Sequence, residues 1–274
     1  MVKKIKIQLG SVQETLLLPL MARAKDAQDR NPILSDKEAI KLIERLDVDQ
    51  DKLLRNLTEI GILGLCYRAS KIEEAIQTFL QKYPNGKILD IGAGLDTTYY
   101  RCDNGEALWY DLDMPDAMQL REQLLPPPNK RVTYIHKSMF DYSWIDDIGD
   151  ISNGLFITIP GVLPYFKEEE VSTFLSTIAS RLKGAEVMFD IISQFGKFFV
   201  DMRIKGAGMK AAHLQWGILE ANKITYWSRH IELIRTLKIF ENSAVQRAKS
   251  ISTKIMMRAN QAMDMTQLVH LRFR

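Results

Sequence analysis

Residues 87–101 read KILDIGAGLDTTYYR, and this stretch decides the fold that the sequence predicts. Its first part, Ile88–Ile91, is a short and mostly apolar run that ends in glycines, a pattern typical of a buried strand followed by a tight turn. Gly92 and Gly94 carry no Cβ, so a ligand can approach the backbone of this turn closely. In a doubly wound α/β sheet the first such loop lies at the switch point where ligands bind.

Downstream of this loop, short apolar runs alternate with helical patterns, which predicts a mostly parallel sheet with helices on both faces. The strand candidates are Ala107–Tyr110, Arg131–His136, Gly154–Ile159, Glu186–Ile192 and Gln267–Phe273. Amphipathic patterns predict helices over 168–182 and 250–261. Residues 231–237 are also expected to be helical, and a sixth strand is expected to begin at 238–240.

Upstream of the loop, residues 11–80 read as helices. Ser35 and Glu38 have the spacing of a capping box, which predicts that a helix starts there. A further helix is expected from about Arg68 to Tyr83, where Pro-Asn-Gly stops it.

We therefore expect a helical cap over residues 1–86 and an α/β core over residues 87–274. Glycines punctuate residues 196–230 of the core. Aromatic residues lie among these glycines, so this insertion is expected to form a lid over the site.

The composition is that of an ordinary globular protein, because 46% of the 274 residues are hydrophobic and 26% are charged. A net charge of +3 is well short of a nucleic-acid signature, so no nucleic-acid partner is expected. No run approaches the roughly 20 apolar residues that a membrane span needs, and the N-terminus lacks the apolar region of a signal peptide. Two cysteines and four scattered histidines offer no metal-ligand spacing and fit a cytoplasmic protein.

The residues around the glycine turn favour a cationic nucleoside over a dinucleotide. A dinucleotide fingerprint needs a third glycine at the position that Thr97 occupies. Asp90 would repel a phosphate but suits a cation, and S-adenosylmethionine carries a sulfonium and an ammonium group without a phosphate. About twenty residues later, Asp111 and Asp113 end the second strand, where a carboxylate can accept both ribose hydroxyls.

Residues 87–101 resemble the first motif of the leucine carboxyl methyltransferase family, which includes bacterial O-methyltransferases of polyketide tailoring. Residues 110–125, YDLDMPDAMQLREQLL, are similar to the second-strand motif of that family, and residues 160–166, PGVLPYF, to its E-G-V-L-x-Y-F motif. The resemblance covers most of residues 11–195. It implies a Rossmann-like class I methyltransferase with a seven-stranded, mostly parallel sheet and S-adenosylmethionine as cofactor.

The resemblance also implies that Arg68 grips the carboxylate of the cofactor, for which a planar guanidinium fork is suited. Two positions depart from the family pattern. The glutamate that approaches the cofactor is Pro160 here, and the acidic position that faces the adenine is Ser138. The residues predicted to bind the cofactor are Arg68, Asp90, Gly92, Gly94, Asp111, Asp113, Ser138, Met139 and Pro160.

The expected function is S-adenosylmethionine-dependent methylation of a carboxylate or hydroxyl oxygen on a small molecule. Tyr165, in the loop that closes the site in the family, and His213, in the predicted lid, are candidate catalytic residues. A carboxylate is already ionised at pH 7, whereas a phenol would benefit from a general base. Two alternatives stay open: a non-catalytic protein of this fold with weakened cofactor binding, and a nicotinamide-dependent oxidoreductase.

Overall fold

The computed structural model describes residues 4–5, 16–206 and 213–274. Within these residues seven strands form one sheet in the order β3-β2-β1-β4-β5-β7-β6. Strands β1 to β5 run parallel to one another, and β7 runs antiparallel to both β5 and β6. The predicted mostly parallel sheet is therefore confirmed. The strands are β1 (Lys87–Ile91), β2 (Leu108–Asp113), β3 (Val132–His136), β4 (Leu155–Ile159), β5 (Glu186–Ile192), β6 (Ile231–Lys238) and β7 (Thr266–Phe273).

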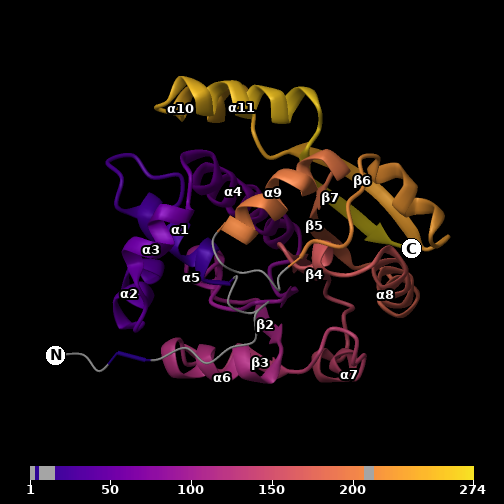
Figure 1. Cartoon of the computed structure of the whole chain (residues 1–274). Coiled ribbons are helices and arrows are strands. Elements are labelled where there is room, and N and C mark those ends of the chain that lie inside the picture. The colour runs from indigo at the N-terminus through magenta and orange to yellow at the C-terminus, as the bar shows by residue number, and fades with distance from the viewer. Residues whose placement is uncertain (1–3, 6–15, 207–212) are drawn as a thin grey trace.

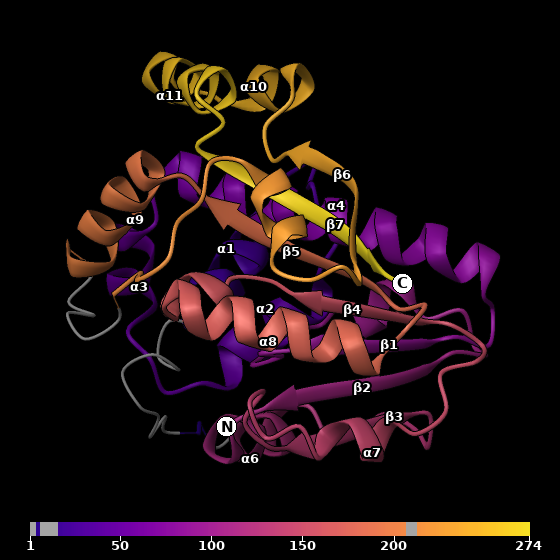
Figure 2. The same ribbon diagram turned by 90° about the vertical axis from the view of Figure 1, so that its right-hand side faces the viewer.

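Helices cover both faces of the sheet because its strands bury both sets of alternating side chains. Leu89 and Ile91 of β1 belong to a core shared with α8 (Glu168–Arg181). Ile88 points to the opposite face, into a core shared with α4 (Glu59–Lys82). Figure 2 shows α8 in front of the strands and α4 behind them.

The predicted N-terminal helical segment is confirmed in the described residues, whereas its expected start at residues 11–15 lies outside them. Helices α1 (Leu17–Ala27), α2 (Lys37–Arg45) and α3 (Gln50–Asn56) lie together on one side of the molecule (Figure 1). They share a core of their own, which also contains Leu95 from the segment after the glycine turn.

Two helix starts in this region differ from the prediction. Asp36, and not Ser35, caps α2, because its side chain accepts the backbone N–H of Ala39 at 3.0 Å. Helix α4 begins at Glu59, nine residues before the predicted start at Arg68. The glycines in its first turns lower helix propensity, but the helix packs there against its neighbours: a Cβ at Gly64 would lie 3.2 Å from the ring of Phe240.

The C-terminal part holds the clearest disagreement with the prediction, because residues 231–238 form strand β6 and not a helix. Ile231 and Ile234 have a helical spacing, yet β6 is an edge strand that pairs with β7 from Ile231↔Phe273 to Lys238↔Gln267. Pairing with a distant strand overrides a weak local pattern. No helix in the described part of the chain is both long and apolar enough to cross a membrane.

Several further helices connect the strands. Helices α10 (Asn242–Arg247) and α11 (Ile251–Ala262) lie beyond one end of the sheet, above α4 and α9 in Figure 1. The predicted insertion contains most of helix α9 (Gln194–Gly206) and all of the short helix η3 (Ala221–Tyr226). The remaining helices are α5 (Tyr99–Cys102), α6 (Pro115–Leu124), α7 (Trp144–Ile148) and η2 (Leu163–Tyr165).

Candidate active site

Two glycines with left-handed backbone conformations build the turn after β1. The angle φ is +76° at Gly92 and +44° at Gly94, a region that favours glycine because a Cβ would strain it. The backbone N–H of Gly92 donates to the carbonyl oxygen of Leu112 at 2.8 Å, which ties the turn to β2. A Cβ at Gly92 would collide with the side chain of Val162, and one at Gly94 would lie 3.4 Å from the Cβ of Leu16. The turn therefore presents bare backbone to the cavity that it lines.

Asp90 and Asp113 bring two carboxylates to the ends of β1 and β2. Asp90 accepts a hydrogen bond from Oγ1 of Thr158 at 2.7 Å, and Asp113 accepts the backbone N–H of Gly94 at 2.8 Å. Burial raises the pKa of both carboxyl groups, and nearby carboxylates raise the pKa of Asp90 further. A cation placed beside these groups would stabilise their ionised forms.

Asp111 differs from Asp113 because it has a charged partner. Its Oδ2 lies 2.5 Å from Nη2 of Arg121, and both side chains are buried. Arg121 also donates through Nη1 to the carbonyl oxygens of Gly94 and Asp96, at 3.0 and 2.8 Å. This buried pair supports the glycine turn, whereas Asp113 accepts the backbone N–H groups of Gly94 and Met114.

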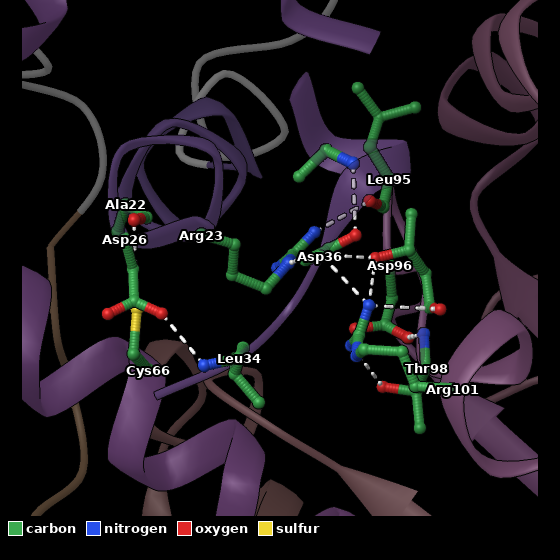
Figure 3. Close-up of polar contacts among 12 residues, drawn as sticks. Ala22, Arg23, Asp26, Leu34, Asp36, Cys66, Leu95, Asp96, Thr98 and Arg101 are labelled. Carbon is green, nitrogen blue, oxygen red and sulfur yellow. Dashed lines mark hydrogen bonds and ion pairs between the residues drawn. The ribbon is translucent and has the colours of Figure 1, made fainter. Parts of the chain in front are cut away.

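A network of charged side chains joins the N-terminal helices to the segment after the glycine turn (Figure 3). Oδ2 of Asp36 lies 2.9 Å from Nε of Arg23 on α1 and 2.9 Å from Nη1 of Arg101 on α5. Arg23 also donates to the carbonyl oxygen of Leu95 at 2.8 Å. Although burial raises the pKa of Asp96, the charges of Arg23 and Arg101 bring it below its usual value. We refer to Arg23, Asp36 and Arg101 as the cap clamp.

Arg68 of α4 reaches the ends of β4 and β5. Its Nη1 lies 3.3 Å from Oδ2 of Asp190 on β5, and Oδ1 of Asp190 accepts the backbone N–H of Gly161 at 2.5 Å. A Cβ at Gly161, where φ is +71°, would lie 2.7 Å from Nη1 of Arg68. The guanidinium therefore lies against the backbone of Gly161, beside Pro160, and all four residues line the cavity.

The two residues predicted after β3 also line the cavity. Oγ of Ser138 accepts the backbone N–H of Phe140 at 3.3 Å. The carbonyl oxygen of Met139 accepts the indole N–H of Trp144 at 2.9 Å. Because β3 is the edge strand beside β2, these residues lie beyond the aspartates as seen from the glycine turn.

One cavity of about 1110 Å³ extends over the carboxyl ends of the parallel strands and is lined by every residue predicted to bind the cofactor. Its acidic half, over β1 and β2, is lined by the glycine turn with Asp90, Asp111 and Asp113. Its apolar half, beside β5 and β7, is lined by α9, α11 and the segments next to them. The apolar half includes Phe195, Phe199, Val200, Leu214, Met256 and Met263. Among the described residues that these helices and flanking segments contribute to the lining, none is charged.

The two candidate catalytic residues occupy different places. Tyr165 lines the cavity and packs against Ile192 and Leu214. His213 is exposed and is not one of the described residues that line the cavity. The structure therefore brings Tyr165, and not His213, to the predicted site.

Three residues of the site were not predicted from the sequence. Asp190 lies in the buried strand EVMFDII, and a carboxylate near the carboxyl end of such a strand is a signal that could have found it. Arg121 reads as an ordinary helix residue and Asp36 as the residue after the predicted cap Ser35, and only the tertiary structure reveals their buried partners. In the part of the chain that is described, no group of three or more His, Cys, Asp or Glu side chains is placed to hold a metal ion.

Comparison with known proteins shows relatives among methyltransferases. A family model described as leucine carboxyl methyltransferase matches residues 17–179. The tetracenomycin polyketide synthesis O-methyltransferase TcmP of Streptomyces glaucescens is 31% identical over 219 residues, which cover 77% of this chain and 77% of that protein. The S-adenosyl-L-methionine-dependent methyltransferase dpfgK of Gibberella zeae is 27% identical over 216 residues, which cover 72% of each chain.

Solved structures share the architecture at low sequence identity. A DUF574 family protein of Streptomyces avermitilis matches with a TM-score of 0.61 and 14% identity, over 92% of this chain and 97% of that chain. At this identity the likeness shows the fold alone. The sheet order with its N-terminal helices is that of the class I methyltransferase fold.

Proposed function

This chain belongs to the leucine carboxyl methyltransferase family, whose members depend on S-adenosylmethionine, and we propose that it methylates an oxygen atom of an apolar small molecule. The observation that carries the proposal is the division of one cavity into an acidic half of fixed polar groups and an adjoining apolar half. Methyl transfer requires two molecules to meet, and the cavity offers each a chemically distinct place.

The residues of the acidic half fit the cofactor by their chemistry. When bound, S-adenosylmethionine supplies a methyl group on a positively charged sulfur atom. Asp90 and Asp113 have carboxyl groups whose pKa is raised by burial, so a neighbouring cation stabilises their charged forms. The bare backbone of Gly94 and the carboxylate of Asp113 suit an adenosine ribose, and Arg68 suits a carboxylate.

The apolar half supports a methyl acceptor with a flat, apolar body. The rings of Phe195 and Phe199 meet edge to face with centroids 4.9 Å apart, and both line the cavity with Met256 and Met263. Aromatic rings offer large apolar contact areas, and methionine adapts to irregular ligands. A relative that takes part in polyketide synthesis is consistent with such an acceptor.

The chemistry of the apolar half favours an acceptor oxygen that is already ionised. Because its described lining residues include no histidine and no carboxylate, a general base for an alcohol is not provided there. A carboxylate or an acidic phenol needs none at neutral pH. The protein then contributes chiefly by aligning the two reactants, with Tyr165 lining the cavity beside them.

Calorimetric titration of the purified protein with S-adenosylmethionine, S-adenosylhomocysteine and NAD tests the cofactor. We expect the first two to bind and NAD not to bind. Incubation with S-adenosylmethionine and a panel of aromatic carboxylic acids and phenols, with release of S-adenosylhomocysteine as readout, tests the acceptor. Cofactor binding without turnover of any panel member would instead favour a non-catalytic protein, and binding of NAD alone would overturn the proposal.

A further inference from the structure

Arg68 and Asp190 place one positive and one negative group side by side at the wall of the cavity. Nη1 of Arg68 and Oδ2 of Asp190 are 3.3 Å apart, and the two side chains are 15% and 16% exposed. Both line the cavity where β4 and β5 end, between its acidic and apolar halves. A ligand that enters the cavity therefore meets both charges together.

Both side chains lie at Gly161, in the loop after β4. The backbone N–H of Gly161 donates to Oδ1 of Asp190 at 2.5 Å. The guanidinium of Arg68 lies against Gly161, where a Cβ would be 2.7 Å from Nη1. One residue of the loop after β4 thus fixes Asp190 through a hydrogen bond and borders the guanidinium of Arg68, which Asp190 in turn holds.

Neither charged group uses its full hydrogen-bonding capacity on the protein. A guanidinium carries five N–H donors and a carboxylate accepts about four hydrogen bonds. Asp190 is the one acceptor that Arg68 reaches within the described residues, at a distance longer than the ~2.7–2.9 Å of a strong charged hydrogen bond. Both groups keep sites for a ligand that offers an acceptor and a donor close together.

The α-amino acid end of S-adenosylmethionine has that pattern, because an ammonium and a carboxylate group sit on one carbon atom. We propose that Asp190 accepts hydrogen bonds from this ammonium group while Arg68 binds the carboxylate, an assignment that rests on the proposed function. Asp90 is less suited to the ammonium group, since it is buried and already accepts from Thr158. Residue 160 is a proline and carries no acidic group, whereas Asp190, hydrogen-bonded to the next residue, Gly161, places a carboxylate there.

Three ligands and two variants test the assignment by calorimetry: S-adenosylhomocysteine, its analogue without the carboxylate and its analogue without the amino group. Asp190→Asn removes the charge but keeps an oxygen for Gly161. It should weaken the two ligands that carry an ammonium group about tenfold and leave the third unchanged or tighter. Arg68→Ala should show the mirror image, with losses for the two ligands that carry a carboxylate.

Glu232→Gln is the matched control. Glu232 lies on β6, forms an ion pair with Arg274 and is not one of the described residues that line the cavity, so its loss should leave all three affinities unchanged. The ratio of affinities within one variant is insensitive to the fraction of folded protein. If Asp190→Asn is insoluble, Gly161→Ala, which displaces both charged groups, should weaken S-adenosylhomocysteine more than either analogue.

Equal losses for all three ligands in Asp190→Asn would mean a purely structural role and would overturn the assignment. Unchanged affinity for the ammonium-bearing ligands would overturn it as well, by placing the ammonium group elsewhere. If the wild-type protein binds none of the three ligands, the proposed function fails and the assignment fails with it, an outcome distinct from the other two.

Discussion

The two halves of the cavity are built in opposite ways. In the acidic half, the polar groups are tied to the protein: Asp111 pairs with Arg121, Arg121 holds the carbonyl oxygen of Gly94, and Asp113 holds its N–H. In the apolar half, Phe195 and Phe199 are 47% and 38% exposed, and the ring of Phe199 contacts those of Phe195 and Phe198. Fixed groups suit a ligand that is always the same, whereas exposed rings can adapt to one that differs between relatives.

This contrast leads us to expect that changes in the acidic half affect the cofactor strongly and that changes in the apolar half affect the acceptor alone. The match to the family model ends at residue 179, before the helices that line the apolar half begin. The residues that line the acidic half therefore lie within the part of the chain that matches the family model, and the helices of the apolar half lie outside it.

The largest effect is expected from Gly94→Val. A side chain there would lie beside Asp113, where we propose that the nucleoside binds, and the left-handed backbone adds roughly 1–2 kcal/mol of strain. We expect affinity for S-adenosylhomocysteine, measured by calorimetry, to fall by about a hundredfold or more, which is roughly 2.8 kcal/mol. Gly105→Val carries similar strain in open space and should lose stability only; equal affinity in both variants would contradict this explanation.

The next effect separates the two aspartates of β2. Asp113→Asn should weaken S-adenosylhomocysteine by about tenfold to a hundredfold, since a charged hydrogen bond contributes roughly 1.5–3 kcal/mol. Asp111→Asn should act on stability, because breaking a buried ion pair with Arg121 costs about 3–5 kcal/mol. Thermal melts and calorimetry on both variants measure the contrast, and an Asp111→Asn protein that melts like the wild type would refute it.

A smaller effect is expected in the apolar half from Phe199→Ala. Loss of a ring from the cavity wall should raise the KM for an apolar acceptor by about threefold to tenfold, roughly 0.7–1.4 kcal/mol, and leave cofactor affinity unchanged. Tyr226→Ala is the control, because this ring is 84% exposed and is not one of the described residues that line the cavity. Equal KM values for the two variants would place the acceptor elsewhere.

The smallest effect is expected from Asp90, whose buried carboxylate lowers the stability of the folded protein when it is ionised. The folded-state pKa of Asp90 is raised above its usual value of 3.8, chiefly by burial, so the stability linked to its protonated form is lost as pH rises through that pKa. Asp90→Asn should therefore melt a few degrees higher than the wild type near pH 8, about 2–4 °C, and the difference should shrink toward about pH 4. Asp150→Asn, which removes an exposed carboxylate with a lowered pKa, should show no such gain.

The sequence was a good guide wherever the pattern was local. The glycine turn, the buried parallel strands and the aspartates at the end of β2 follow from short motifs, and these elements appear where they were expected. Residues 231–237 were wrongly expected to be helical, with a strand beginning only at 238, because an edge strand with one exposed face has little pattern of its own and depends on β7.

The same distinction explains which site residues were missed. Asp190 acts beside Arg68 across 122 residues of chain, a separation at which no motif connects them. Arg121 has the position of a solvent-exposed helix residue, yet it is buried under the glycine turn. Such contacts depend on the order of the strands in the sheet. The spacing of residues in the sequence does not predict that order.

The cap clamp also bears on how the molecule is assembled. Asp36 pairs with Arg23 of α1, but its further partners Thr97, 61 residues later, and Arg101 are made only after α1 and α2 have left the ribosome. The polar contacts that join the N-terminal helices to Leu95, Thr97 and Arg101 can therefore form only after β1 and its turn have been synthesised. Substitution of Asp36 alone would therefore leave the buried Arg23 without its ionic partner, which ties the assembly of the N-terminal helices to a single carboxylate.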